Sequence, residues 1–162
     1  MPGSVTLRPI EEGDADFLRR LYATTRADEM AAVDWSEAEK AEFVRSQFQA
    51  QHTYYMEQFP GSTFDLILED GEPIGRLYVD RRRDEIRLID IALMPEKRRS
   101  GIGGRLMRQV LDEAEGAGLP VQIHVERYNP ALALYRRLGF EVVEDQQVYY
   151  LMKWTPPQGE SG

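Results

Sequence analysis

The sequence predicts an α+β fold with a mostly antiparallel mixed sheet of six to seven strands, flanked by about four helices. Segments that alternate apolar and polar residues, as strands do, are interleaved with segments whose apolar residues recur at helical spacing. Asp70-Gly71 joins two alternating segments as a hairpin turn, and a second hairpin closes the ordered chain. A length of 162 residues with 42% hydrophobic content is enough to bury one core.

The first half of the chain is expected to run from a strand through two helices to a hairpin. Val5 to Leu7 predicts the strand, and Asp14 is expected to cap the helix that follows it. The apolar positions of that helix are Phe17, Leu18 and Leu21. Ser36 to Glu39 has the pattern of a capping box and predicts the start of a second helix. Alternating residues on both sides of Asp70-Gly71 then predict the two strands of the hairpin.

The second half is expected to contain two single strands, two helices and a final hairpin. Ile86 to Leu93 predicts a strand with high apolar content. A helix is expected from about Gly101 to Ala117. In Val121 to Glu126 one face is apolar and the other polar, which is typical of a strand. Pro130 is expected to start a short helix, and Glu141 to Trp154 predicts the hairpin.

Composition and charge limit the classes of partner. A single domain over residues 1–154 is expected, followed by a disordered tail at 155–162. The net charge of −8 argues against general nucleic-acid or anionic-membrane binding, since both use basic patches. The absence of cysteine excludes disulfides, thiolate zinc ligands and thiol catalysis. No leader pattern or spanning apolar stretch is present, so a cytoplasmic protein is expected, with a homodimer left open.

A basic, glycine-rich loop lies between the strand 86–93 and the helix 101–117. Five cations cluster in and after it, although the chain as a whole is acidic: Lys97, Arg98, Arg99, Arg105 and Arg108. A diphosphate needs several converging N–H groups, and the first turn of a helix offers unpaired N–H groups with a favourable dipole. Glycines allow that backbone to approach closely. The loop therefore predicts an anion site, with a flexible helix start and a solvated basic face as the alternative.

The form of the loop narrows the class of anion. A P-loop is excluded because no lysine-serine or lysine-threonine pair follows the glycines, and Gly101-Ile102-Gly103 lacks the third glycine of a dinucleotide site. The run Arg98-Arg99-Ser100-Gly101-Ile102-Gly103 instead resembles the acetyl-CoA signature of the GCN5-related N-acetyltransferase (GNAT) superfamily. That signature is arginine or glutamine, two variable residues, glycine, a variable residue, then glycine or alanine. The family has it after the fourth strand and before the third helix, as here.

A second segment supports the same resemblance. Asn129 to Phe140 resembles the family's later motif, in which an asparagine precedes a short helix that carries a tyrosine and ends in leucine-glycine-phenylalanine. Asn129 lies one residue closer to Tyr135 than in the commoner spacing. The element order resembles the family from Val5 to Trp154, which implies the GNAT fold.

The resemblance implies how acetyl-CoA binds as cosubstrate, without a metal. In this family the fourth and fifth strands splay apart, and the pantetheine arm pairs with the exposed backbone. The implied cofactor-binding residues are Ala92, Leu93, Met94, Arg98, Arg99, Ser100, Gly101, Ile102, Gly103, Gly104, Asn129 and Tyr135.

The resemblance also implies direct attack of an amine on the thioester. Tyr135 matches the family tyrosine that protonates the leaving thiolate, with a core-edge packing role as the alternative. His124 is the preferred general base because its ordinary pKa is near neutrality. Asp90, Glu126 and a water chain are the rival bases.

The acceptor is expected to be a small primary amine. Asp28, Glu29, Asp34 and Trp35 lie in the region 27–55 that shapes the acceptor pocket in the family, and carboxylates beside an aromatic ring suit a cationic amine. Three alternatives stay open: a protein amine as acceptor, a noncatalytic acyl-CoA-binding module, and a loop that binds another phosphate ligand.

Overall fold

The computed structural model describes residues 4–127, 129 and 131–157, and the chain divides into two compact units. The first unit is Met1–Leu77 with Ala92–Arg98, and the second is Tyr78–Ile91 with Arg99–Gly162. Two of the three boundaries fall inside the strands β3 (Glu72–Arg81) and β4 (Ile86–Leu93), so each strand contributes to both units, and the third falls between Arg98 and Arg99 in the loop before α4 (Ile102–Ala117). A single domain over residues 1–154 stays a prediction. So does the tail at 155–162, of which residues 158–162 lie outside the described residues.

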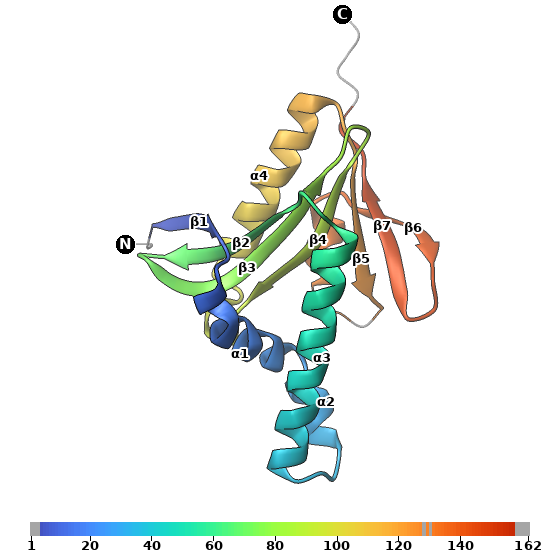
Figure 1. Ribbon diagram of the computed structural model, residues 1–162. Helices are drawn as coiled ribbons and strands as arrows, with labels where there is room; N and C mark the ends of the chain where they lie inside the picture. Colours follow the sequence, from blue (N-terminus) through green and yellow to red (C-terminus); the bar gives the residue numbers. More distant parts are fainter. Residues whose placement is uncertain (1–3, 128, 130, 158–162) are drawn as a thin grey trace, which may run out of the picture. The chain divides into compact units, whose positions relative to one another are not determined.

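The strands confirm the predicted fold class (Figure 1). Besides β3 and β4 they are β1 (Val5–Pro9), β2 (Thr63–Glu69), β5 (Val121–Glu126), β6 (Glu141–Asp145) and β7 (Tyr149–Trp154). They form a sheet of seven strands in the order β1-β2-β3-β4-β5-β7-β6. β4 and β5 are parallel, whereas β1/β2, β5/β7 and β6/β7 are antiparallel.

The described residues contain five α-helices, against about four expected. They are α1 (Ala15–Thr25), α2 (Ala27–Ala32), α3 (Glu37–Gln58), α4 (Ile102–Ala117) and α5 (Leu132–Arg137). Two short 3-10 helices, η1 (Glu12–Asp14) and η2 (Pro95–Lys97), precede α1 and follow β4. The six-residue α2 was not predicted, because its sequence has no apolar periodicity that distinguishes it from a loop.

A core of aromatic and aliphatic side chains lies inside the first unit. Its buried members come from α1, α3 and β2: Phe17, Leu18, Leu21, Tyr22, Val44, Phe48 and Leu66. The predicted capping box is present, because Ser36 Oγ accepts from Glu39 N at 3.1 Å and Glu39 Oε1 accepts from Ser36 N at 3.2 Å. The side chains of Ala92 and Met94 pack against this core, which fixes the end of β4 to it.

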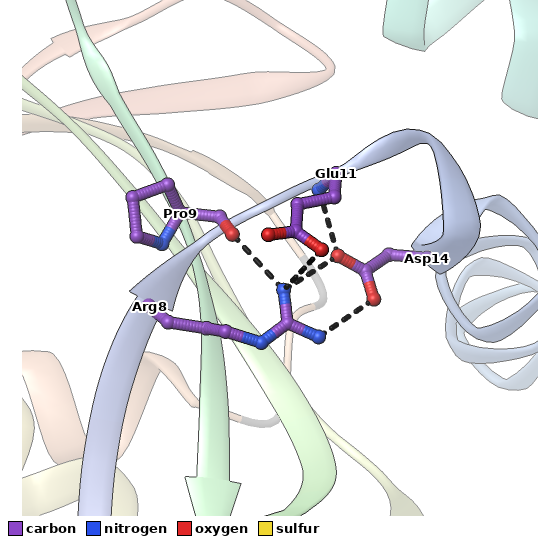
Figure 2. A network of polar contacts seen from close by, with 4 residues as sticks. All are labelled: Arg8, Pro9, Glu11 and Asp14. Carbon is purple, nitrogen blue, oxygen red and sulfur yellow. Dashed lines mark hydrogen bonds and ion pairs between the residues drawn. The ribbon is translucent and has the colours of Figure 1, made fainter.

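Asp14 occupies the predicted N-cap position of α1, but its side chain makes no cap hydrogen bond to that helix. Its carboxylate instead accepts two hydrogen bonds from the Arg8 guanidinium, at 2.8 and 2.9 Å, and one from Glu11 N at 2.7 Å (Figure 2). Arg8 also donates to the Pro9 carbonyl at 3.0 Å. These bonds tie the end of β1 to η1, and the Arg8 hydrogen bond lowers the pKa of Asp14.

Helix α4 and the strands after it follow the sequence pattern in the second unit. Gly101 (φ 87°) and Gly118 (φ 70°) flank α4 in the left-handed conformation that glycine adopts without strain. The buried positions of α4 recur at helical spacing, as expected for the predicted helix: Ile102, Leu106, Met107, Val110, Leu111 and Ala114. In β5, Ile123 and Val125 are buried while His124 and Glu126 are exposed, as alternation predicts. Pro130, the expected start of α5, lies outside the described residues.

Candidate functional site

The parallel ladder between β4 and β5 ends early. Only three register pairs join the strands, Ile86↔Val121, Arg87↔Gln122 and Leu88↔Ile123, although both strands continue. Within the second unit, 89–91 and 124–126 therefore extend beyond the ladder without pairing with each other. The β5 residues still pair with β7 on their other side, as in His124↔Leu151. A strand edge that no longer faces a paired strand can pair with an extended ligand arm, although the Glu126 carbonyl already accepts from Asn129 N at 2.9 Å.

The loop before α4 has the geometry of an anion cradle. Arg99 has φ 60° and Gly101 has φ 87°, so the backbone turns through left-handed conformations just before the helix. Gly101 is the N-cap and supplies no side-chain acceptor to the first-turn N–H groups of α4. A Cβ on Gly101 would meet no atom within 4 Å, so this glycine is required by conformation rather than by a crowded neighbour. An anion fits the unsatisfied donors and the helix dipole here.

The end of β4 in the first unit is held by hydrogen bonds on both sides. Met94 N donates to Ile74 O at 2.8 Å, and Met94 O accepts from Lys97 N at 2.8 Å. The Arg98 guanidinium folds back toward the strand, where Nε donates to Leu93 O at 3.2 Å. Both backbone groups of Met94 are therefore engaged inside the first unit, and its role in cofactor binding stays a prediction.

Arg98 and Lys97 have partners that the sequence did not predict. Arg98 Nη2 donates to Thr24 Oγ1 on α1 at 3.3 Å, a contact across more than seventy residues of chain. Lys97 forms an ion pair with Glu69 of β2, which raises the pKa of the lysine. The alternative for this loop was a solvated basic face. Lys97 differs from that alternative, because its ammonium group is paired with the Glu69 carboxylate.

Tyr135 and Asp90 lie within electrostatic range of one another in the second unit. Tyr135 on α5 is buried, with 4% of its surface exposed, and its ring meets Phe140 edge-on at 5.9 Å. Burial, and then the negative charge of Asp90, raise the pKa of the Tyr135 hydroxyl above its ordinary value. The phenol is therefore a neutral donor over the whole physiological range.

Asn129 has a structural role at the start of the tyrosine's helix. Its Oδ1 accepts from Ala131 N at 2.8 Å, and its backbone carbonyl accepts from Leu132 N at 3.1 Å. Leu134 of α5 lies near Gly104 of α4: a Cβ added to Gly104 would be 3.9 Å from Leu134 Cδ1. The helix α5 therefore packs close to the first turn of α4. Asn129 thus orients α5 and with it Tyr135.

His124 lies on the other face of β5 from the buried residues. Its exposed ring approaches Arg87, whose Nη1 is 3.4 Å from His124 Nδ1. Desolvation, and then the Arg87 charge, lower the pKa of His124. Strand alternation places Asp90 with Leu88, on the face opposite to Arg87. The structure therefore brings Tyr135 together with Asp90 and leaves His124 on the opposite face.

Several carboxylates of the region 27–55 already form ion pairs with cations three residues away along the chain. Glu29 accepts from Arg26 at 2.9 Å, and the Arg26 guanidinium lies 5.7 Å above the Phe43 ring. Trp35 is 41% exposed and packs edge-on against the same ring at 5.3 Å. A groove of about 340 Å³ in the first unit has more cations than carboxylates along its walls. Its lining residues are Arg19, Arg20, Ala23, Ala27, Met30, Glu37, Lys40, Ala41 and Val44.

Two features are absent from the described part of the chain. None of its helices combines the length and the apolar content needed to cross a membrane. Across the same residues, no group of three or more histidines or acidic residues is placed to hold a metal ion.

The sequence matches a model of the acetyltransferase (GNAT) family over residues 27–140. The match spans more than half of the chain, from α2 to the end of the α5 motif.

Two curated relatives match parts of the chain. This chain is 37% identical to mycothiol acetyltransferase of Thermobifida fusca (strain YX) over 84 residues. The aligned part is 51% of this chain and 23% of that relative. It is 36% identical to [ribosomal protein bS18]-alanine N-acetyltransferase of Escherichia coli (strain K12) over 69 residues. Here the aligned part is 41% of this chain and 47% of that relative. The chain therefore spans less than half the length of either relative.

A solved structure supports the fold over nearly the whole chain. The PaiA N-acetyltransferase of Thermoplasma acidophilum, in complex with coenzyme A, aligns with a TM-score of 0.69 and 18% sequence identity. The alignment covers 94% of this chain and 99% of that one.

Proposed function

The chain belongs to the acetyltransferase (GNAT) family, and from this we propose that it transfers the acetyl group of acetyl-CoA to a primary amine. The observation that carries the proposal is the early end of the β4–β5 ladder after Leu88↔Ile123. Two neighbouring strands that stop pairing with each other suit an extended, amide-containing arm such as pantetheine, which pairs as an added strand does. Both curated relatives are named as acetyltransferases, which supports the reaction class.

The proposed cofactor contacts are given for each unit by itself. In the second unit, the turn Arg99-Ser100-Gly101 and the first turn of α4, Ile102 to Gly104, bind the diphosphate. In the first unit, Ala92 and Leu93 pair with the pantetheine arm, Arg98 supplies charge, and Met94 supports that edge through its bond to Ile74. Asn129 acts indirectly by capping the turn into α5.

The proposed chemistry needs two proton transfers. The amine nitrogen forms a bond to the thioester carbonyl carbon, the C–S bond breaks, and the thiolate takes a proton from the Tyr135 hydroxyl. The raised pKa of Tyr135 keeps this donor protonated until the thiolate forms. The ammonium proton of the acceptor goes to a base, for which His124 and Asp90 are the candidates. Asp90 lies close enough to act on Tyr135 electrostatically, while the lowered pKa of His124 keeps that ring unprotonated at neutral pH.

The proposed acceptor is a small primary amine, with a protein amine as the second candidate. Exposed Asp28, Asp34 and Trp35 support the first. The groove lined by Arg19, Arg20 and Lys40 supports the second, since those cations suit a peptide with acidic side chains. The relative from Escherichia coli (strain K12) is named for an alanine of a ribosomal protein, which also supports a protein amine.

One experiment tests the function and separates the acceptors. Purified protein is titrated with acetyl-CoA, CoA, ATP and NAD, and thiol release is then followed with small cationic amines, acidic peptides and basic peptides. We expect CoA thioesters to bind far more tightly than the nucleotides, and a primary amine to give turnover. Binding without turnover on any amine would favour the noncatalytic module. Binding of ATP or NAD in preference to CoA would refute the loop assignment.

A further inference from the structure

Gly75 lies inside β3 at a point of unusually close backbone approach. A Cβ built on this buried residue would lie 2.3 Å from Ala92 O, 2.9 Å from Leu93 Cδ2 and 3.1 Å from Leu93 Cα. Real Cβ atoms essentially never come closer than 3.0 Å to another heavy atom. Any side chain at Gly75 therefore requires the backbone of Ala92 to move by about 0.7 Å or more.

The reason for glycine here is space rather than backbone conformation. Gly75 is absent from the residues with positive φ, so its backbone is one that any residue adopts. A glycine in the interior of a strand costs stability and often marks a place where another backbone comes close. At Gly75 that neighbour is the last part of β4, and all the atoms involved belong to the first unit.

The same part of β4 is held from three directions. Met94 N donates to Ile74 O beside the glycine, the Ala92 and Met94 side chains pack into the core, and Arg98 Nε donates to Leu93 O. These contacts fix the end of β4 against β3. Because Gly75 has no side chain, the Ala92–Leu93 backbone can lie close to β3 at this point.

We infer that Gly75 is a positioning residue for the acceptance of a CoA thioester, because it sets the path of the Ala92–Leu93 backbone with which the pantetheine arm pairs. This inference rests on the proposed function. Gly75 touches no reacting atom in it and acts through Ala92 and Leu93 alone. Displacements of about 1 Å in a binding edge cost up to about a hundredfold in rate, so a shift of the size that a Cβ demands is large enough to measure.

Calorimetric titration of Gly75→Ala tests the inference. Two probes are used: acetyl-CoA, and 3′-phosphoadenosine 5′-diphosphate, which keeps the diphosphate but lacks the pantetheine arm. We expect Gly75→Ala to bind acetyl-CoA about tenfold to a hundredfold more weakly than wild type, and the nucleotide within about twofold. Gly13→Ala is the matched control in the same unit, because its Cβ would meet nothing within 4 Å and its affinities should not change.

The outcomes separate this inference from the proposed function. If wild type does not bind acetyl-CoA, the proposed function itself fails. If wild type binds and Gly75→Ala binds equally well, or loses both probes to the same extent, the positioning role is overturned. A selective loss of acetyl-CoA supports it.

A second variant covers the possibility that Gly75→Ala gives no cooperative thermal transition. Met94→Pro removes the N–H that donates to Ile74 O, and the φ of −57° at Met94 already suits proline. Met94→Ala shortens the same side chain but keeps the N–H. We expect acetyl-CoA to bind Met94→Pro at least about fivefold more weakly than Met94→Ala, with equal binding of the nucleotide. Equal acetyl-CoA affinity in the two Met94 variants would refute the inference.

Discussion

Replacing Tyr135 with phenylalanine separates the chemistry of the hydroxyl from the packing of the ring. The ring is 4% exposed and meets Phe140 edge-on at 5.9 Å, and phenylalanine retains both the burial and this contact. Phenylalanine differs from tyrosine only by the hydroxyl, so we expect the free energy of unfolding to change by less than about 1 kcal/mol.

Turnover should respond much more strongly than stability. General acid catalysis is worth about 10²–10⁴-fold, or about 2.7–5.4 kcal/mol of activation free energy. We expect kcat of Tyr135→Phe to fall at least about tenfold while the Kd for acetyl-CoA changes less than about twofold. The assay follows thiol release at saturating acceptor, with single-turnover measurements to confirm that the chemical step limits the rate. Wild-type kcat for Tyr135→Phe under those conditions would leave the tyrosine with a packing role only.

The pH dependence provides a second check on the same residue. Burial and the Asp90 charge both disfavour the phenolate, so the pKa of Tyr135 is raised and the hydroxyl stays protonated to above pH 10. Loss of a protonated acid would lower the rate only above that pKa. We therefore expect no descending limb from Tyr135 below about pH 10. A descending limb near pH 8 that disappears in Tyr135→Phe would contradict the assigned environment.

Three further predictions concern the base, an ion pair and a helix cap. If His124 is the base, wild-type kcat/KM should rise with pH through an ionisation below the ordinary 6.5, because burial and Arg87 lower the pKa of His124, and His124→Gln should abolish that limb. An unaltered profile would leave Asp90, Glu126 and a water chain as the candidates. Asp14→Asn should destabilise the protein by about 1–2 kcal/mol in urea unfolding at pH 7, since the paired carboxylate is 10% exposed and its Arg8 partner 36%. The folded-state pKa of Asp14 is lowered, so its contribution is present above about pH 4 and is lost as pH falls through the folded pKa; a difference that persists at pH 2 would argue against the ion pair. Ser36→Ala should cost about 1 kcal/mol through loss of the α3 cap, measured by thermal denaturation, and no change in Tm would mean that the cap is unimportant.

Local patterns predicted most of the elements because their causes are local. The Ser36–Glu39 capping box, the Asp70-Gly71 turn and the alternation in β5 each involve residues only a few positions apart. Asp14 is at the predicted N-cap position, but the partner of its side chain is not a local one. A helix cap is a local interaction, whereas Arg8 approaches from the preceding strand. Its guanidinium donates two hydrogen bonds to the Asp14 carboxylate, and such a charged pair is stronger than a bond to a backbone N–H of the helix.

The candidate site was less accessible to sequence reasoning. The loop 98–104 and Tyr135 follow from motifs, but the partners of the site depend on chain segments far apart. Thr24 beside Arg98 and Ile74 beside Met94 carry no local signal. At Gly75 the sequence does contain a local signal, because a glycine interrupts an otherwise apolar strand pattern. The pattern does not reveal which backbone approaches that glycine.

The early end of the β4–β5 ladder has a consequence for the handling of the purified protein. The segments 89–91 and 124–126 do not pair with each other, and strand edges of this kind can pair with other chains, which promotes aggregation. A ligand that occupies those edges competes with such pairing and also stabilises the native state, by about 2.7 kcal/mol at a concentration of 100 times its Kd. We therefore expect purification without a CoA compound to give a lower Tm and more turbidity on heating. Light scattering during a thermal ramp, with and without CoA, would show whether the open ladder is where association begins.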